Sequence, residues 1–234
     1  MLRRNSMRTG LLGLSLGLSL AWAAPAQGVI DSTRAKADFV LTADPASADW
    51  KFVKPVMAPN DHMGAAADGL RTEIRSRWSA EALYILFVCP YGNLFLKPNP
   101  VTSTETNKLW DWDVAELFIG WDFDHIERYK EFEISPQGEW VDLDIDRKHP
   151  AKDGGVSWNS GFTSKTRIDS AHKVWYGEMR IPFKSISPTA PKTGQRFRVN
   201  FYRMQGIERN MIAWQPTHAR SFHVPESFGV MELK

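Results

Sequence analysis

The sequence predicts an all-β fold, an antiparallel β-sandwich of the jelly-roll type with few short helices. Short apolar segments recur at near-regular spacing with turn residues between them, which is typical of sandwiches and barrels. Residues 175–181 and 197–201 alternate apolar and polar side chains, as strands with one solvent-facing side do. Outside residues 1–26, no window of a dozen residues keeps the 3.6-residue period of a helix.

The individual strands follow from local pattern. Residues 83–88 are apolar at consecutive positions, so we expect a central strand that is buried on both sides. The turn at 135–138, Ser-Pro-Gln-Gly, has Pro and Gly placed as a tight hairpin requires. The other predicted strands are residues 114–119, 129–134, 139–145, 174–181, 196–204 and 229–233.

Composition limits the classes of function. The 234 residues are 43% apolar and 24% charged, which is typical of one globular domain, and they contain no internal repeat. There are 29 basic and 27 acidic residues, and removing the three arginines of the first eight residues leaves 26 against 27, a net charge of −1. A nearly neutral body argues against nucleic acid or an anionic membrane surface as the main partner.

The first 26 residues have the pattern of a secretory signal peptide: arginines, then an apolar stretch, then small residues. Cleavage is expected after Ala23 or Ala26, and the protein is expected to be secreted or periplasmic. No later stretch reaches the roughly 20 apolar residues of a membrane helix.

Residues 27–38 are interpreted as a connector and 39–234 as the folded domain. Cys89 is the single cysteine, so no intramolecular disulfide can form. Oligomeric state and surface attachment stay open.

The aromatic-rich stretch 110–121 is the first candidate binding segment. On an extended chain Trp110, Trp112 and Glu116 share one face, and the strand is expected to begin near Val114, which leaves both tryptophans on or beside a loop. The C–H face of a sugar packs on aromatic rings, and carboxylates or Arg bind its hydroxyls. The alternative is that both tryptophans close the end of the core.

A second candidate segment lies near the end of the chain. Residues 215–227 hold two prolines among polar and aromatic residues, which predicts a structured loop before a last strand, and long ordered loops are frequently functional. Arg220, Phe222 and His223 are its candidate ligand-binding residues.

Several motifs together resemble the family 9 carbohydrate-binding modules and their secreted, DOMON-like relatives. They are Trp-x-x-Asp-x-x-Glu-Leu-Phe-Ile at 110–119, Leu-Tyr-Ile-Leu-Phe at 83–87, Ala-Trp-Gln-Pro-Thr at 213–217 and Ser-Phe-His-x-Pro-x-x-Phe-Gly at 221–229. The resemblance covers residues 39–234. It implies a β-sandwich, a non-catalytic role in carbohydrate breakdown, a sugar held between two aromatic side chains, and structural calcium in some members.

By position, the resemblance implies that Trp110 and Phe222 form the two sides of the aromatic clamp and that Glu116 hydrogen-bonds the sugar. This chain departs from the pattern at three positions. Phe222 replaces a Trp, Glu133 stands where better-known modules have a basic residue, and Ala219 stands where they have an amide. The identity of the ligand, whether a chain end, a free sugar or neither, stays open.

Metal binding has two weaker candidates in the sequence. Asp142, Asp144 and Asp146 share a strand face and could hold calcium, although a solvated face is the preferred interpretation. The loop at 122–125, Asp-Phe-Asp-His, is the second. The six histidines show no paired ligand spacing, which argues against a zinc enzyme.

Catalysis is not the favoured interpretation, although it stays open. Glycoside hydrolysis requires two carboxyl groups facing each other across a cleft. Glu131 and Glu133 share a strand face and are expected to pair with Lys or Arg instead. Three alternatives to a sugar-binding module remain: a haem-binding electron-transfer domain using Met204, Met211 and His223, a glycoside-hydrolysing enzyme, and a protein-interaction module.

Overall fold

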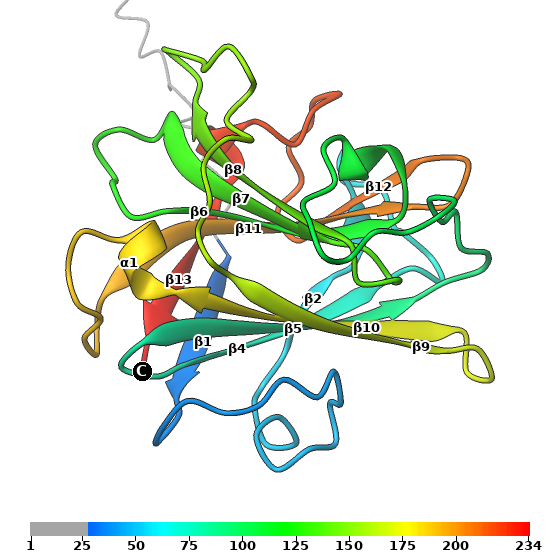
Figure 1. Ribbon diagram of the computed structural model, residues 1–234, viewed down its shortest axis with the longest axis horizontal. Coiled ribbons are helices and arrows are strands. Elements are labelled where there is room, and N and C mark those ends of the chain that lie inside the picture. Colours follow the sequence, from blue (N-terminus) through cyan, green and yellow to red (C-terminus); the bar gives the residue numbers. More distant parts are fainter. Residues whose placement is uncertain (1–27) are drawn as a thin grey trace, which may run out of the picture.

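The computed structural model describes residues 28–234, and the predicted signal peptide lies outside them. Its strands form two layers packed face to face, joined at one side by the first strand (Figure 1). The order of hydrogen-bonded strands is β8-β7-β6-β11-β13-β1-β4-β5-β10-β9. Three short strands lie off this path. β2 pairs with β4, β3 pairs with β12, and β12 also pairs with β11.

The element bounds are as follows. The strands are β1 Val29–Arg34, β2 Val56–Ala58, β3 Asn60–Asp61, β4 Thr72–Trp78, β5 Ala82–Pro90, β6 Val114–Gly120, β7 Arg128–Ile134, β8 Trp140–Asp146, β9 Thr163–Asp169, β10 Val174–Pro182, β11 Arg196–Gln205, β12 Asn210–Ala213 and β13 Gly229–Leu233. The helical elements are α1 Phe183–Ile186 and the 3-10 turns η1 Leu109–Asp111 and η2 Pro225–Ser227.

The all-β class is confirmed, and the strand pairing differs from the prediction at one place. β1 pairs parallel with both β13 and β4, whereas the other named pairs are antiparallel. The jelly-roll connectivity stays a prediction. No helix among residues 28–234 has the length and apolar character to cross a bilayer.

The predicted connector needs a correction. Residues 29–34, which the sequence places before the domain, form β1 and are hydrogen-bonded to both layers. This strand contributes one large apolar side chain to the core, Ile30, while Ser32 is buried and bonded to Ser76 at 2.8 Å. Because β1 has so few apolar residues, its sequence shows no strand pattern. Backbone pairing with two neighbouring strands, more than side-chain burial, holds β1 in place.

The main core lies between the layers and is built by alternation along the strands. On β11 the side chains of Phe197, Val199 and Phe201 point into it, and Phe201 meets Phe87 of β5 edge to face at 6.0 Å. The hairpin turn at Gly138 is confirmed: Gly138 has φ of 90° and its N–H donates to the Ser135 carbonyl at 3.0 Å.

The sides of β10 and β11 that were expected to face solvent are largely covered, which corrects that expectation. Below the β4-β5-β10 layer, residues 39–53 pack on Tyr84 and Leu86, and Trp50 donates to buried Glu178 at 2.7 Å (Figure 1). Above β11, the loop that follows β12 covers Asn200, which exchanges two hydrogen bonds with the Gln215 backbone at 2.8 and 3.0 Å. The polar residues of the alternating pattern are therefore buried, because groups of the covering loops form hydrogen bonds with their side chains.

Candidate functional site

A cavity of about 450 Å³ opens on the outer face of the β8-β7-β6-β11 layer, beneath the loops that follow β8 and β12. Five of the six candidate ligand-binding residues of the sequence line it: Trp110, Glu116, Arg220, Phe222 and His223. They come from two segments about 100 residues apart along the chain. The fold thus gathers the two candidate segments at one place.

Trp110 lies in η1, whose entry is a left-handed residue, Lys108, with φ of 61°. Leu109 is buried beneath this turn while the Trp110 side chain stays half-buried. The Arg209 guanidinium donates to the backbone carbonyls of Trp110 at 3.2 Å and of Asp111 at 3.0 Å. The turn is therefore tied to the segment before β12, which holds the indole at the edge of the cavity.

Phe222 is fixed by Tyr202 of β11. The two rings stack with centroids 4.2 Å apart and planes 13° from parallel, and the Tyr202 hydroxyl donates to the Phe222 carbonyl at 3.0 Å. Phe222 is 6% exposed. One face of the phenyl ring is therefore taken by Tyr202, and the remaining surface contributes to the cavity.

His223 follows Phe222 and contacts β7. Its Nδ1 shares a hydrogen bond of 2.7 Å with the Tyr129 hydroxyl, and its Nε2 lies 3.9 Å from Glu131 Oε2. Burial, reinforced by the positive charge of Arg147, lowers the pKa of His223 to about 4. The imidazole is therefore neutral at pH 7, and its contact with Glu131 is polar rather than a salt bridge.

Three buried carboxyl groups form the floor of the cavity, and we call Glu116, Glu131 and Glu133 the glutamate cluster. Glu116 on β6 stands opposite Glu133 on β7, and Glu131 is two residues earlier on the same face of β7. One carboxyl oxygen from each lies within 4.8 Å of the others. The expected pairing of Glu131 and Glu133 with Lys or Arg is wrong. Their face of β7 points into the cavity and lies beneath loops.

The environment of the glutamate cluster disfavours negative charge. Burial raises the pKa of Glu131 to about 7. Burial together with the charge of Glu131 holds the pKa of Glu116 well above its usual value. For Glu133, burial and then the charges of Glu116 and Glu131 raise the pKa in the same direction. A proton or a bound cation is what such a cluster needs.

Trp112, the sixth candidate, does not line the cavity. It packs against Phe95, with ring centroids 4.6 Å apart and planes 31° from parallel. The η1 turn breaks the extended geometry under which Trp110 and Trp112 share a face. The neighbouring Asp113 carboxylate accepts from the Phe95 N–H at 3.0 Å and from Gln205 Nε2 at 2.9 Å, which anchors this loop beside Trp112.

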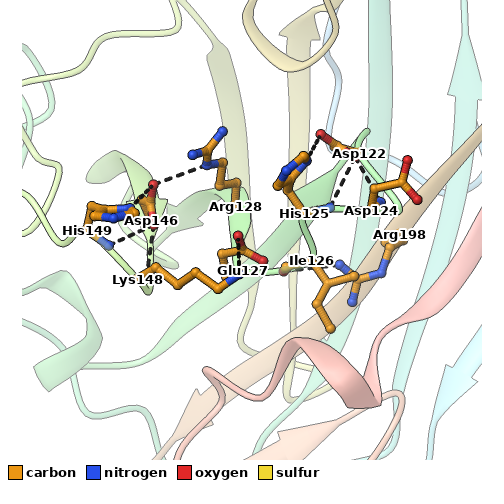
Figure 2. A network of polar contacts seen from close by, with 10 residues as sticks. All are labelled: Asp122, Asp124, His125, Ile126, Glu127, Arg128, Asp146, Lys148, His149 and Arg198. Atoms are coloured by element: carbon orange, nitrogen blue, oxygen red, sulfur yellow. Dashed lines mark hydrogen bonds and ion pairs between the residues drawn. The ribbon is translucent and has the colours of Figure 1, made fainter.

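The two weaker metal candidates use their carboxylates within the chain. Figure 2 shows Asp122 accepting from the backbone N–H of Asp124 and His125 and contacting the His125 ring, with Nδ1 at 2.8 Å. Asp146, also drawn there, is bonded to Arg128 and to two backbone N–H groups. Asp142 accepts from Ser160 and is fully buried, so the solvated-face interpretation is wrong for Asp142.

The haem candidates also reach this cavity, since Met204, Met211 and His223 all line it. Met204 is buried and Met211 half-buried. Sequence reasoning placed Glu131 and Glu133 on one strand face but not in the site, and it did not single out Arg209. For the two glutamates, the missing information was that their face of β7 lies beside Glu116, which becomes readable only once the pairing of β6 with β7 is known.

Residues 44–234 match the family described as carbohydrate family 9 binding domain-like. An extracellular protein of Arthroderma benhamiae is 24% identical over 134 residues, which are 51% of this chain and 60% of that protein. The chain thus matches about three-fifths of the length of this curated relative.

Solved structures share the fold. A family 9 carbohydrate-binding module from Caldicellulosiruptor kristjanssonii, determined with glucose and with cellotriose, superposes with a TM-score of 0.63 in both cases. The identities are 15% and 16%, and the matches cover 88% of this chain and 96% and 94% of the module. A protein from Bacteroides uniformis gives a TM-score of 0.68 at 13% identity, covering 89% of this chain and 100% of that protein. From the match over residues 44–234, this chain belongs to the carbohydrate family 9 binding domain-like family.

Proposed function

We propose that this chain is an exported, non-catalytic carbohydrate-binding protein that holds a sugar between Trp110 and Phe222 in support of polysaccharide breakdown. The observation that carries the proposal is one cavity that gathers an indole, a phenyl ring and buried carboxyl groups from distant segments. Its volume of about 450 Å³ lies in the range of small-ligand sites.

The chemistry of the cavity suits a sugar. Trp110 and Phe222 offer apolar ring surface to the C–H groups of a pyranose, while Glu116 and Arg220 offer an acceptor and a donor to its hydroxyls. The Tyr202 ring already covers part of Phe222, so the stacking area is smaller than two free indoles provide. We therefore expect weak affinity, with Kd between micromolar and millimolar, or about −8 to −4 kcal/mol.

Glucose and cellotriose are the first ligands to test, because they occupy the structures of the Caldicellulosiruptor module. The extracellular relative and the leader pattern of residues 1–26 support export. Soluble release and attachment outside the cell are both compatible with this role.

The experiment is a calorimetric titration of the purified protein with glucose and cellotriose, repeated on Trp110→Ala. Trp112→Ala is the matched control, because it removes the same side chain from a position that does not line the cavity. We expect Trp110→Ala to abolish binding without lowering the melting temperature by more than a few degrees, and Trp112→Ala to bind as wild type. Equal loss in both variants, or unfolding of Trp110→Ala, would count against the proposal.

Haem binding is the second candidate, favoured by the presence of Met204, Met211 and His223 on one cavity. Met and His are the axial ligands of electron-transfer haems. Three buried carboxyl groups on the floor work against it, because haem brings two propionates of the same charge. A visible absorption spectrum of the protein, before and after addition of haemin, decides between the two: a strong haem band that His223→Ala removes would favour electron transfer.

The arrangement of carboxyl groups also bears on hydrolysis. All three members of the glutamate cluster belong to β6 and β7, hence to one wall. Glycoside hydrolysis places its two carboxyl groups on opposite sides of the scissile bond. The cavity therefore fits holding a sugar better than cleaving it, and a reducing-sugar assay on cellotriose tests this.

A further inference from the structure

The glutamate cluster is unusual in being both buried and unpaired. Glu116 is 2% exposed, Glu131 4% and Glu133 0%. Within the described part of the chain, both carboxyl oxygens of Glu133 have no hydrogen-bond partner, nor has Oε1 of Glu116 or Oε2 of Glu131. Buried carboxyl oxygens are normally hydrogen-bonded or paired with a cation, because desolvation is otherwise uncompensated. All three side chains line the cavity, and the unpaired oxygens are themselves buried.

Neither of the nearby basic side chains, Arg209 and His223, donates a hydrogen bond to these carboxyl oxygens. Arg209 also lines the cavity, but its guanidinium donates to the carbonyls of Trp110 and Asp111. His223 approaches Glu131 to 3.9 Å, beyond hydrogen-bonding distance, and its other ring nitrogen is engaged by Tyr129. The geometry thus presents acceptor oxygens to which neither Arg209 nor His223 donates, and a proton held between Glu131 and Glu133 or a bound cation is what compensates their burial.

The spacing of the oxygens matches the coordination sphere of a hard cation. Ca²⁺ binds carboxylate oxygens at 2.3–2.6 Å, so two ligands on opposite sides of one ion are about 5 Å apart. The three oxygens of the cluster all lie within 4.8 Å of one another. Three carboxylates, each mono- or bidentate, supply three to six of the six to eight oxygens that Ca²⁺ takes. An all-carboxylate set does not suit zinc, which selects His and Cys.

We propose that Glu116, Glu131 and Glu133 together bind a hard divalent cation, with Ca²⁺ as the first candidate, and that its remaining coordination positions open into the cavity. The site is separate from the two aspartate segments considered from the sequence. The inference goes beyond sugar binding and does not rest on it. Where a sugar also binds, its hydroxyls are oxygen ligands that can fill the open positions.

The test uses the purified protein, treated with a chelator that is then removed, and titrated with Tb³⁺ and Ca²⁺. Tb³⁺ shares the oxygen preference of Ca²⁺, and its luminescence is excited by energy transfer from nearby indoles such as Trp110, which lines the same cavity. The variants are Glu133→Gln and Glu116→Gln, which keep side-chain volume. Asp144→Asn is the control, because Asp144 is exposed, pairs with Lys130 and does not line this cavity.

We expect saturable, one-to-one Tb³⁺ binding that Ca²⁺ displaces, and a melting temperature that Ca²⁺ raises. Each Gln variant is expected to weaken Ca²⁺ binding at least about tenfold, while Asp144→Asn leaves it unchanged. The Gln variants replace a buried carboxyl group that lacks a partner with a neutral amide of the same size, so they are expected to fold about as well as wild type without metal.

Two results would overturn the proposal: no cation binding up to about 10 mM, beyond the range of extracellular calcium modules, or equal binding by wild type and both Gln variants. A separate cellotriose titration in the presence of chelator tests the sugar proposal alone. Its failure leaves a positive cation result standing, and a negative cation result leaves sugar binding untouched, so the two outcomes are distinguishable.

Discussion

The hydroxyl of Tyr129 lies 2.7 Å from Nδ1 of His223 and joins β7 to the loop that precedes β13. Tyr129 is buried among Phe118 and Phe228, with ring centroids 5.5 and 5.2 Å away. The hydrogen bond therefore fixes a loop side chain against a rigid sheet. Because Phe222 is the preceding residue, the same bond helps to hold the second aromatic side of the proposed sugar site.

Tyr129→Phe removes this bond and little packing. We expect the free energy of unfolding to fall by about 1 kcal/mol, because His223 Nδ1 loses its partner while the ring contacts remain. Urea denaturation measures the change. Cellotriose affinity is expected to fall modestly, since the position of His223 is less restricted. An unchanged stability and affinity would show that the loop is held by other contacts.

The two aromatic residues of the proposed clamp are expected to respond differently to truncation. Phe222 is buried and stacked on Tyr202, so Phe222→Ala is expected to cost about 3 kcal/mol of stability. Trp110 is half-buried, and Trp110→Ala is expected to cost about 1 kcal/mol. Thermal unfolding of both variants tests this. A more costly Trp110→Ala would mean that Trp110 closes the core.

Because Phe222→Ala confounds folding with binding, Phe222→Leu is the informative binding variant. It keeps apolar volume, so its stability is expected within about 1.5 kcal/mol of wild type. It removes the flat ring, and we expect cellotriose affinity to fall roughly tenfold, or about 1.4 kcal/mol. Calorimetry measures the affinity, and wild-type affinity in a folded Phe222→Leu would argue against stacking at this position.

Glu105 gives the chain a defined dependence on pH. Burial, then the negative charge of Asp142, raises the pKa of Glu105 from 4.5 to about 7. Between these values the folded chain keeps a proton that the unfolded chain has released, so the free energy of unfolding falls as pH rises through this window. Glu105→Gln mimics the protonated form and removes this loss.

We expect Glu105→Gln to be more stable than wild type by about 1 kcal/mol at pH 8, a value reduced by solvent screening at this half-buried site. The difference is expected to vanish near pH 4, where Glu105 is protonated in both states. Urea denaturation at the two pH values measures it. Glu81→Gln, on an exposed residue, controls for the loss of one negative charge. A constant difference at both pH values contradicts the assignment.

The loop after β8 depends on Gly155. This residue has φ of +96°, and a Cβ placed on it would lie 2.3 Å from the Asp144 carbonyl oxygen. We expect Gly155→Ala to cost about 3 kcal/mol and to weaken ligand binding, because Val156 and Gly154 of the same loop line the cavity.

Gly154→Ala is the matched control for Gly155→Ala. Gly154 also has a positive φ, of +76°, but a Cβ there has no neighbour within 4 Å. Its expected cost is the backbone strain alone, about 1 kcal/mol. Thermal unfolding of the two variants separates strain from collision, and equal losses would show that the loop moves freely away from Asp144.

The strands that the sequence predicts are the ones whose apolar side chains fill the core. β5, with residues buried along most of its length, and β11, with alternating Phe and Val, are clear in the sequence and present in the structure. The strands that were missed have other origins. β9 reads Thr-Ser-Lys-Thr-Arg-Ile-Asp and lies at the edge of its layer, where one hydrogen-bonded neighbour, β10, holds it. Edge strands of this kind need little apolar burial.

β4 shows how small polar residues hide a buried strand. Its exposure alternates strictly, with Ile74, Ser76 and Trp78 buried and the charged residues between them half-buried. Ser76 occupies a core position because it bonds to Ser32 across the junction of the layers. In the sequence a serine at that place suggests a turn. The partner that explains its burial, Ser32, is 44 residues away.

The amino-acid sequence by itself determined the all-β class, the strands rich in apolar residues, the hairpin at Gly138 and the two segments that carry Trp110 and Phe222. These follow from periodicity and turn chemistry, which are local. Tertiary structure decided that Trp112 turns to Phe95, that β1 joins both layers, and that three glutamates converge on one cavity. Those outcomes depend on strand register and on which loop covers which face, and both are set by contacts between residues distant along the chain.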